Sequence, residues 1–212
     1  MLILNLISSP FVLIGLLLAL LIAITFHEYA HAWMSTRLGD PTAQYAGRLT
    51  LNPLKHLDPF GAILLLLVGF GWGKPVPYNP QFLRNGKWDE LRIALAGPIT
   101  NLIIALIFAI PYRIAYYLNL DWSENPLFII TAVITEINII LAVFNILPIP
   151  PLDGSKIVYL FVSGETKSKL ERYGPIFLLI LIFAIYVLRI DFFGRFLSPI
   201  IQWLLNLVRV FP

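Results

Sequence analysis

Long apolar runs alternate with short polar connections along the chain. Runs with almost no Asp, Glu, Lys or Arg cover residues 1–26, 99–111, 127–135, 137–152 and 175–188. A membrane-spanning helix needs about 20 apolar residues, and fewer where protein shields it. The pattern predicts an all-α polytopic membrane protein with three or four spanning helices, forming a single membrane-embedded domain over residues 1–212.

Local signals locate the first helices. A spanning helix is expected over residues 11–38, because this stretch is apolar on nearly every face and is followed by Gly39 and Pro41. Pro98 is expected near the start of the next helix, where the missing N–H of a proline costs little.

The second half of the chain is interrupted by prolines. A spanning helix is expected over residues 127–145, and the three prolines within residues 148–151 break the helix after it. The segments that follow are a short helix over 154–161, a solvated loop over 167–172 and a last span over 174–188. For residues 195–211 the sequence leaves open an interfacial helix or a partial return through the membrane.

The connection after the first helix is rich in glycine and proline. Its apolar piece, residues 62–68, is too short to span a bilayer, so we expect a re-entrant or interfacial segment there. A minor membrane-associated β element is expected near residues 45–80. The pair Gly73 and Lys74 does not belong to a phosphate-binding loop, because Val68 stands where that motif requires glycine, and we expect no bound nucleotide.

Composition and charge support a membrane protein. The chain is 58% hydrophobic and 13% charged, with a mean hydropathy of +0.82, far from the balance of soluble domains. Seven basic residues fall within residues 37–92 and four within 156–172, against one within 113–125. Cytoplasmic loops collect Lys and Arg, so the two basic segments are expected to face the cytoplasm of a cell-membrane, multi-pass protein. Topology therefore explains the basic charge, and we expect no nucleic-acid partner.

One helix carries a candidate metal site. His27 and His31 are four residues apart and share a helix face, with Glu28 beside them to handle protons. Counting back from Leu38 at about 1.5 Å per residue places His27 roughly 16 Å inside the helix end. The motif could occur by chance in a structural helix. However, ionisable residues inside a membrane helix must face the bundle interior or a cavity, which favours a metal site.

A catalytic zinc site needs a third protein ligand. The chain has no cysteine, so any metal must be held by histidine and carboxylate. The candidates are Asp40, His56, Asp58, Glu136 and Asp153. Asp40 lies at the helix end, and His56 and Asp58 lie in a loop rich in turn residues, where structural roles are equally plausible. Asp153 ranks first because a proline-broken helix can present a polar group within the membrane.

Together these segments resemble the site-2 protease family of intramembrane zinc metalloproteases, in its short form without PDZ or CBS domains. The resemblance rests on His27-Glu28-Tyr29-Ala30-His31, residues 47–59, Ala96-Gly97-Pro98 with Asn101, and residues 145–154.

The resemblance implies a zinc-dependent endopeptidase that lies in the bilayer and cleaves within or near the transmembrane segments of membrane-protein substrates. It further implies one Zn²⁺ per chain held by His27, His31 and Asp153, with Glu28 as the general base. Asn145 would help to hold the substrate or to stabilise the oxyanion.

Two other functions and one substrate-binding hypothesis accompany this interpretation. A membrane metal-ion transporter would line ionisable residues along a pathway, whereas the sequence gathers them at one depth. A catalytically inactive scaffold would have no use for Glu28. Strands around residues 48–52 could bind an unwound substrate segment by strand addition. Asn101 and Asn138, which lie within predicted spans, are expected to form interhelical hydrogen bonds.

Overall fold

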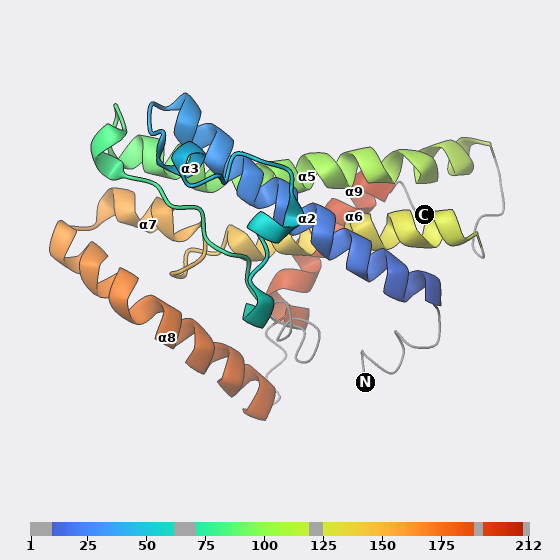
Figure 1. Cartoon of the computed structure of the whole chain (residues 1–212). Helices are drawn as coiled ribbons and strands as arrows, with labels where there is room; N and C mark the ends of the chain where they lie inside the picture. The colour runs from blue at the N-terminus through green and yellow to red at the C-terminus, as the bar shows by residue number, and fades with distance from the viewer. Residues whose placement is uncertain (1–9, 62–70, 119–124, 189–192, 210–212) are drawn as a thin grey trace.

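The computed structural model describes residues 10–61, 71–118, 125–188 and 193–209, and these residues are mainly helical (Figure 1). In chain order the helices are α2 (Pro10–Arg37), α3 (Thr42–Tyr45), η1 (Pro53–Lys55), η2 (Pro80–Phe82), α5 (Lys87–Tyr117), α6 (Pro126–Asn145), α7 (Ser155–Phe161), α8 (Gly164–Leu188), η3 (Phe193–Leu197) and α9 (Ser198–Arg209).

Three helices, α2, α5 and α6, form the core. Each is long and apolar enough to cross a membrane, with spanning stretches of 28, 29 and 20 residues. Figure 1 shows α2 crossing over α5 and α6, which lie side by side, whereas α8 diverges from them toward its C-terminal end. The expectation of an all-α membrane protein is confirmed.

Small side chains let the three helices approach one another. Ala19 of α2 is fully buried in a cluster with Ile104 of α5 and Ile134 of α6. A Cβ atom at Gly15 would lie 3.1 Å from the Cβ of Val133, so α2 packs closely on α6 at that point. Small residues at such contacts are typical of membrane helices, because association there depends on close packing.

The C-terminal helix covers the opposite side of α5 and α6. Leu197, Leu205 and Val208 are buried against Ala109 of α5 and Ile139 of α6. The 12 residues of α9 extend about 18 Å, which is less than the apolar thickness of a bilayer. By its length, α9 does not cross the membrane alone.

The predicted helix boundaries agree with the structure for α2, α6 and α7 but not for α5. Helix α5 begins at Lys87, about ten residues before Pro98, which lies inside the helix. The backbone N–H of Asn85 donates to Asp89 at 2.8 Å, so an acidic side chain of the first turn caps the helix start. The helix therefore begins at this cap and not at Pro98, which the sequence had favoured as the helix start.

Residues 167–172 are also helical rather than a solvated loop. Helix α8 begins at Gly164, and the hydroxyl of Ser163 accepts a hydrogen bond from the backbone N–H of Thr166 at 3.3 Å. This is an N-cap interaction, and it allows the charged segment to continue the helix.

The β element predicted near residues 45–80 is reduced to one antiparallel bridge between Leu57 and Gly73 among the residues that the structure describes. The backbone N–H of Lys74 donates to the carbonyl of His56 at 2.7 Å beside it. The segment contains several prolines, which lack the N–H that a longer ladder would need. Residues 48–52 form no strand, and the segment 62–68 lies outside the described residues.

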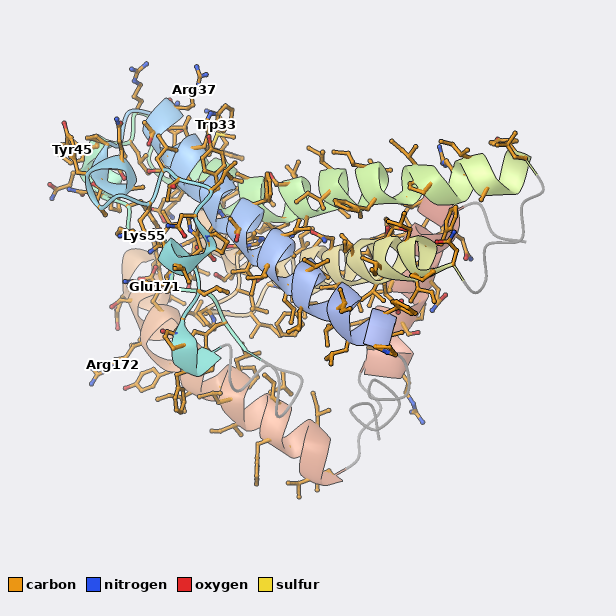
Figure 2. All side chains as sticks on the ribbon, turned by 45° about the vertical axis from the view of Figure 1, so that its right-hand side comes forward. Trp33, Arg37, Tyr45, Lys55, Glu171 and Arg172 are labelled. Carbon is orange, nitrogen blue, oxygen red and sulfur yellow. The ribbon has the colours of Figure 1, made fainter. Side chains whose placement is uncertain are left out.

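Charged and aromatic side chains gather at one end of the molecule. Figure 2 shows Arg37 and Lys55, from the first basic segment, at the same end as Arg172 from the second. Trp33 and Tyr45 lie there too. These basic residues of the two segments therefore lie on one side of the protein, at the end where α2 finishes and α8 begins. That this side faces the cytoplasm stays a prediction.

Candidate metal centre and active site

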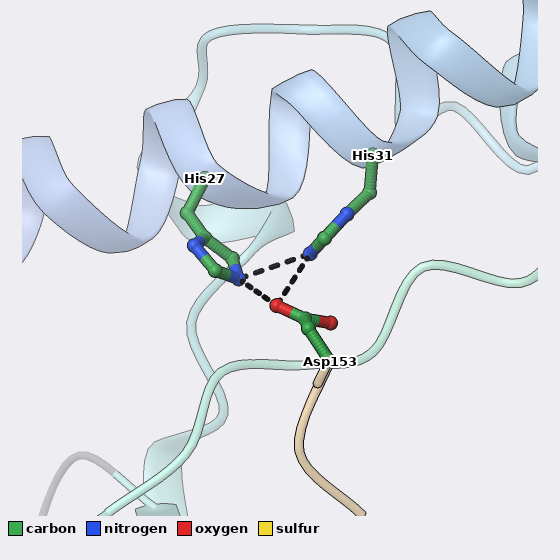
Figure 3. Close-up of side chains that lie close together, drawn as sticks. All are labelled: His27, His31 and Asp153. Atoms are coloured by element: carbon green, nitrogen blue, oxygen red, sulfur yellow. Dashed lines mark hydrogen bonds and ion pairs between the residues drawn. The ribbon is translucent and has the colours of Figure 1, made fainter. Parts of the chain in front are cut away.

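Two imidazoles project from one face of α2 toward the bundle interior. His27 and His31 are separated by one helical turn, and both are buried. Their Nε2 atoms lie 3.0 Å apart, and the two rings meet edge to face. Figure 3 shows both rings pointing to the same place.

Asp153 reaches this place from the broken segment that follows α6 (Figure 3). Its Oδ2 lies 3.1 Å from Nε2 of His27 and 3.4 Å from Nε2 of His31. The turn is tight at the next residue, since a Cβ atom at Gly154 would lie 1.9 Å from the carbonyl oxygen of Ile146. Glycine at this position allows the chain to fold back and present Asp153.

The hydrogen bonds behind the two rings fix their tautomers. Nδ1 of His27 lies 2.6 Å from Oδ1 of Asn101, and Nδ1 of His31 lies 2.7 Å from the carbonyl oxygen of Ile93. Both oxygens can only accept, so each Nδ1 carries the proton in neutral imidazole. Each Nε2 therefore directs a lone pair toward Asp153.

This arrangement fits a bound cation. Oδ2 of Asp153 is buried and has no hydrogen-bond donor within the described part of the chain, while two nitrogen lone pairs face it. One ligand atom from each of His27, His31 and Asp153 can be chosen so that all lie within 4.8 Å of one another. Two imidazole nitrogens and a carboxylate oxygen match the donors of catalytic zinc sites, which leave one position open.

Glu28 lies next to the cluster and contacts a buried arginine. Its Oε2 is 3.9 Å from Nη2 of Arg48, and both side chains are almost fully buried. The guanidinium of Arg48 also donates from Nη1 to the carbonyl of Pro75 at 2.9 Å and from Nη2 to the carbonyl of Lys74. Burial lowers the pKa of Arg48, and the nearby Glu28 carboxylate opposes that shift.

A cavity of about 590 Å³ opens beside the cluster. Glu28 and Asn145 line it together with the three candidate ligands, and its wall is otherwise mostly apolar. Leu178 and Leu179 of α8 form part of that wall. Nδ2 of Asn145 donates to the carbonyl of Leu141 at 3.0 Å.

The remaining candidate ligands are not part of the cluster. Among the described residues, His27, His31 and Asp153 are the one group of His, Cys, Asp and Glu side chains arranged to hold a metal ion, so Glu136 lies outside it. The carboxylate of Asp40 accepts from the backbone N–H of Asn79 at 2.7 Å, and Asp58 accepts from the N–H of Gly61 at 2.8 Å.

His56 also has a structural role. It is fully buried, and its Nε2 lies 2.6 Å from the carbonyl oxygen of Thr50. The side chain thus fixes the bend that precedes η1, and its ring is not directed at the cluster.

The sequence did not reveal the contact between Asn101 and His27. Asn101 and Asn138 were each expected to form interhelical hydrogen bonds, and this is confirmed, because Asn101 donates to Oδ1 of Asn138 at 2.9 Å. One signal was present: Ile93, Gly97 and Asn101 repeat at a spacing of four, the same spacing that separates the two histidines.

A spanning helix supplies two histidines and a glutamate, and the segment after another spanning helix supplies an aspartate beside them. This arrangement is typical of a membrane zinc metalloprotease. The sequence matches the family described as Peptidase family M50 over residues 15–118 and 111–188, and the chain belongs to that family. The resemblance to site-2 proteases is thereby confirmed, and the protein is a metalloprotease hydrolase.

Curated relatives carry matching names. The chain is 41% identical to "Putative zinc metalloprotease YwhC" of Bacillus subtilis over 172 residues, which are 78% of each chain. It is 29% identical to "Putative zinc metalloprotease Rip2" of Mycobacterium tuberculosis over 196 residues, 88% of this chain and 71% of that one. It is 34% identical to "Putative zinc metalloprotease MJ0611" of Methanocaldococcus jannaschii over 147 residues, 63% of each. No solved structure gives a significant match.

Proposed function

We propose that this protein is an intramembrane zinc endopeptidase, which cleaves peptide bonds within or near the transmembrane segments of other membrane proteins. The observation that supports this most is the mostly apolar cavity at the His-His-Asp cluster, between the spanning helices and α8. Such a lining suits an apolar segment better than a soluble peptide. The proposal includes a multi-pass location in the cell membrane.

The depth of the cluster supports the same substrate class. His27 lies ten residues before the end of α2 at Arg37, or about 15 Å along the helix. A substrate therefore has to reach the cluster within the thickness of the bilayer. Because a helix hides its carbonyl groups, the substrate segment must unwind near the bond to be cleaved.

We assign one zinc ion per chain to His27, His31 and Asp153. Zinc held there supplies Lewis acidity toward a water molecule and a peptide carbonyl. Glu28 takes the proton of the attacking water and later passes it to the leaving amine. Arg48 lies beside Glu28 and donates to the carbonyls of Lys74 and Pro75, which links the proposed base to the segment that lines the cavity at Pro75.

We assign Asn145 to the substrate carbonyl. One hydrogen of its amide is used by the carbonyl of Leu141, and an amide nitrogen carries two, so the second is available to the cavity. A donor in a largely apolar cavity stabilises the negative charge that develops on the carbonyl oxygen.

The test is cleavage of a model transmembrane substrate by the purified, zinc-loaded protein in detergent, with the cut located by mass spectrometry. The matched control is a soluble peptide substrate without an apolar segment. Cuts within or close to the apolar segment, with no cleavage of the soluble peptide, are expected. Efficient cleavage of the soluble peptide with an intact transmembrane substrate would overturn the proposed substrate class.

A further inference from the structure

One face of α5 follows the two histidines of α2. Ile93 contacts His31 through its carbonyl oxygen, and Asn101 contacts His27 through its side chain. Gly97 lies midway between them, so residues spaced by four on α5 match residues spaced by four on α2. The hydrogen-bond partners of both Nδ1 atoms therefore come from a single helix, α5.

Gly97 makes this approach possible. A Cβ atom there would lie 2.6 Å from Cε1 of His27 and 2.6 Å from Nε2 of His31. These distances are too short for any side chain, so the backbone of α5 lies against the rings themselves. Asn101 can reach Nδ1 of His27 because α5 is this close.

Every polar atom of the Asn101 side chain is used. Its Oδ1 accepts from His27 at 2.6 Å, and its Nδ2 donates to the carbonyl of Ala23 at 3.2 Å and to Oδ1 of Asn138 at 2.9 Å. The side chain is fully buried, so water cannot replace a lost partner. The two acceptors at Nδ2 force the oxygen of the amide to face His27.

Asn138 of α6 is fixed in the same way. It is fully buried, and its Nδ2 donates to the carbonyl of Ile134 at 2.8 Å. This bond orients Oδ1 of Asn138 toward Asn101. A continuous chain of hydrogen bonds therefore runs from α6 through α5 to a candidate metal ligand on α2.

We propose that Asn101 and Asn138 are positioning residues of the metal centre, which is the site assigned above to zinc. Asn101 holds His27 as the Nδ1–H tautomer with Nε2 free to bind, and Asn138 keeps the Asn101 oxygen turned toward His27. The inference rests on the proposed role of His27 as a ligand. Partners that orient a ligating histidine typically change metal affinity 10–100-fold when removed.

The experiment measures zinc affinity of the full chain in detergent by competition with a chelator, for wild type, Asn101→Leu, Asn138→Leu and the double variant. Asn101→Leu is expected to weaken binding about 10–100-fold, and Asn138→Leu to weaken it by a smaller factor. The double variant is expected to match Asn101→Leu, because Asn138 acts through Asn101.

The matched control is Thr135→Val. Thr135 is a fully buried polar residue of α6 whose hydroxyl donates to the carbonyl of Thr131, so its loss disturbs the bundle without touching the chain of amides. Its zinc affinity is expected to equal that of wild type. Absorption spectra of the cobalt-substituted proteins, which report ligand geometry, are expected to change in the two Asn→Leu variants only.

Wild-type affinity in both Asn→Leu variants would overturn the inference while leaving the zinc site intact. Equal weakening in Thr135→Val would also overturn it, since the asparagines would then only join helices. Absence of zinc binding by wild type is a different result, because it would overturn the proposed function itself together with this inference.

Discussion

The carboxylate of Glu28 on α2 lies 3.9 Å from the guanidinium of Arg48, in the loop that follows. Arg48 in turn donates to the carbonyls of Lys74 and Pro75, and Pro75 lines the cavity. The proposed general base and the wall that faces a substrate are therefore held by the same side chain.

Replacing Arg48 with alanine is expected to lower kcat at least about tenfold, while the zinc content stays that of wild type. A tenfold loss corresponds to about 1.4 kcal/mol of transition-state stabilisation. The substitution removes the charged donor to the carbonyls of Lys74 and Pro75 and the cation beside Glu28, so the proposed base is no longer held in place. Steady-state cleavage with metal analysis of the same sample provides the measurement. The control is Arg92→Ala, since that side chain is 57% exposed and pairs only with Asp89 among the contacts described. An unchanged kcat for Arg48→Ala would contradict this account of the loop.

The substitution Gly97→Ala is expected to weaken zinc binding at least about tenfold, as expected when a metal ligand loses its orientation. The added methyl group would lie 2.6–2.7 Å from atoms of both imidazoles, so one ring must move. Chelator competition measures the effect. Gly164→Ala at the start of α8 is the control, because a Cβ atom there meets nothing within 4 Å. Equal affinities for the two variants would show that the rings have more room than the structure indicates.

Removal of the Glu90 carboxylate is expected to destabilise the junction of α5 and α8. Glu90 is buried and accepts from Lys167 of α8 at 2.8 and 3.0 Å, with Lys156 of α7 at 3.7 Å. Breaking a fully buried ion pair costs about 3–5 kcal/mol. Lys167 is 21% exposed, so Glu90→Ala should lower the thermal midpoint in detergent by a smaller free energy than this. The comparison is Glu165→Ala, which removes an exposed pair with Lys169 that contributes less than about 1 kcal/mol. Similar midpoints for both variants would show that the pair of Glu90 and Lys167 does not stabilise the contact between α5 and α8.

The hydrogen bonds that join Asp40, after the end of α2, to Thr42 and Asn79 are expected to weaken in acid. Burial opposes ionisation of this carboxyl, but hydrogen bonds from Thr42, Asn79 and Ser35 outweigh it and lower the pKa below the ordinary 3.8. A depressed pKa contributes stability that is complete above pH 3.8 and is lost as the pH falls through the folded-state pKa. Thermal midpoints measured from neutral pH downward should therefore fall less steeply below pH 3.8 for Asp40→Asn than for wild type. Parallel curves would show that Asp40 does not contribute this dependence.

The sequence was sufficient for two of the spanning helices and for singling out His27, His31 and Asp153, which the structure brings together. Apolar sequence determines α2 and α6, because each helix reaches the length of about 20 residues that a bilayer requires. The start of α8 was missed, since its charges resemble a solvated loop until Lys167 meets Glu90, 77 residues away. That pairing forms only in the tertiary structure, so the sequence around Lys167 does not indicate it.

The same reason explains what was found and missed at the metal centre. His27 and His31 share a helix, so their spacing alone brings them together. The contact of Asn101 with His27 joins residues 74 apart, and only the packing of α5 on α2 produces it. Among the described residues, the predicted β element is reduced to the bridge between Leu57 and Gly73, in a segment where several prolines lack the N–H of a ladder.

The central claim is that the His-His-Asp cluster holds a zinc ion and that Glu28 performs the proton transfer beside it. The direct measurement compares wild type and Glu28→Gln, quantifying bound zinc and cleavage of a transmembrane substrate in the same preparations. The account predicts about one zinc per chain in both proteins, from one three-ligand site, with cleavage lost only in Glu28→Gln. Wild-type protein that holds no zinc, or a Glu28→Gln variant that cleaves at the wild-type rate, would contradict it.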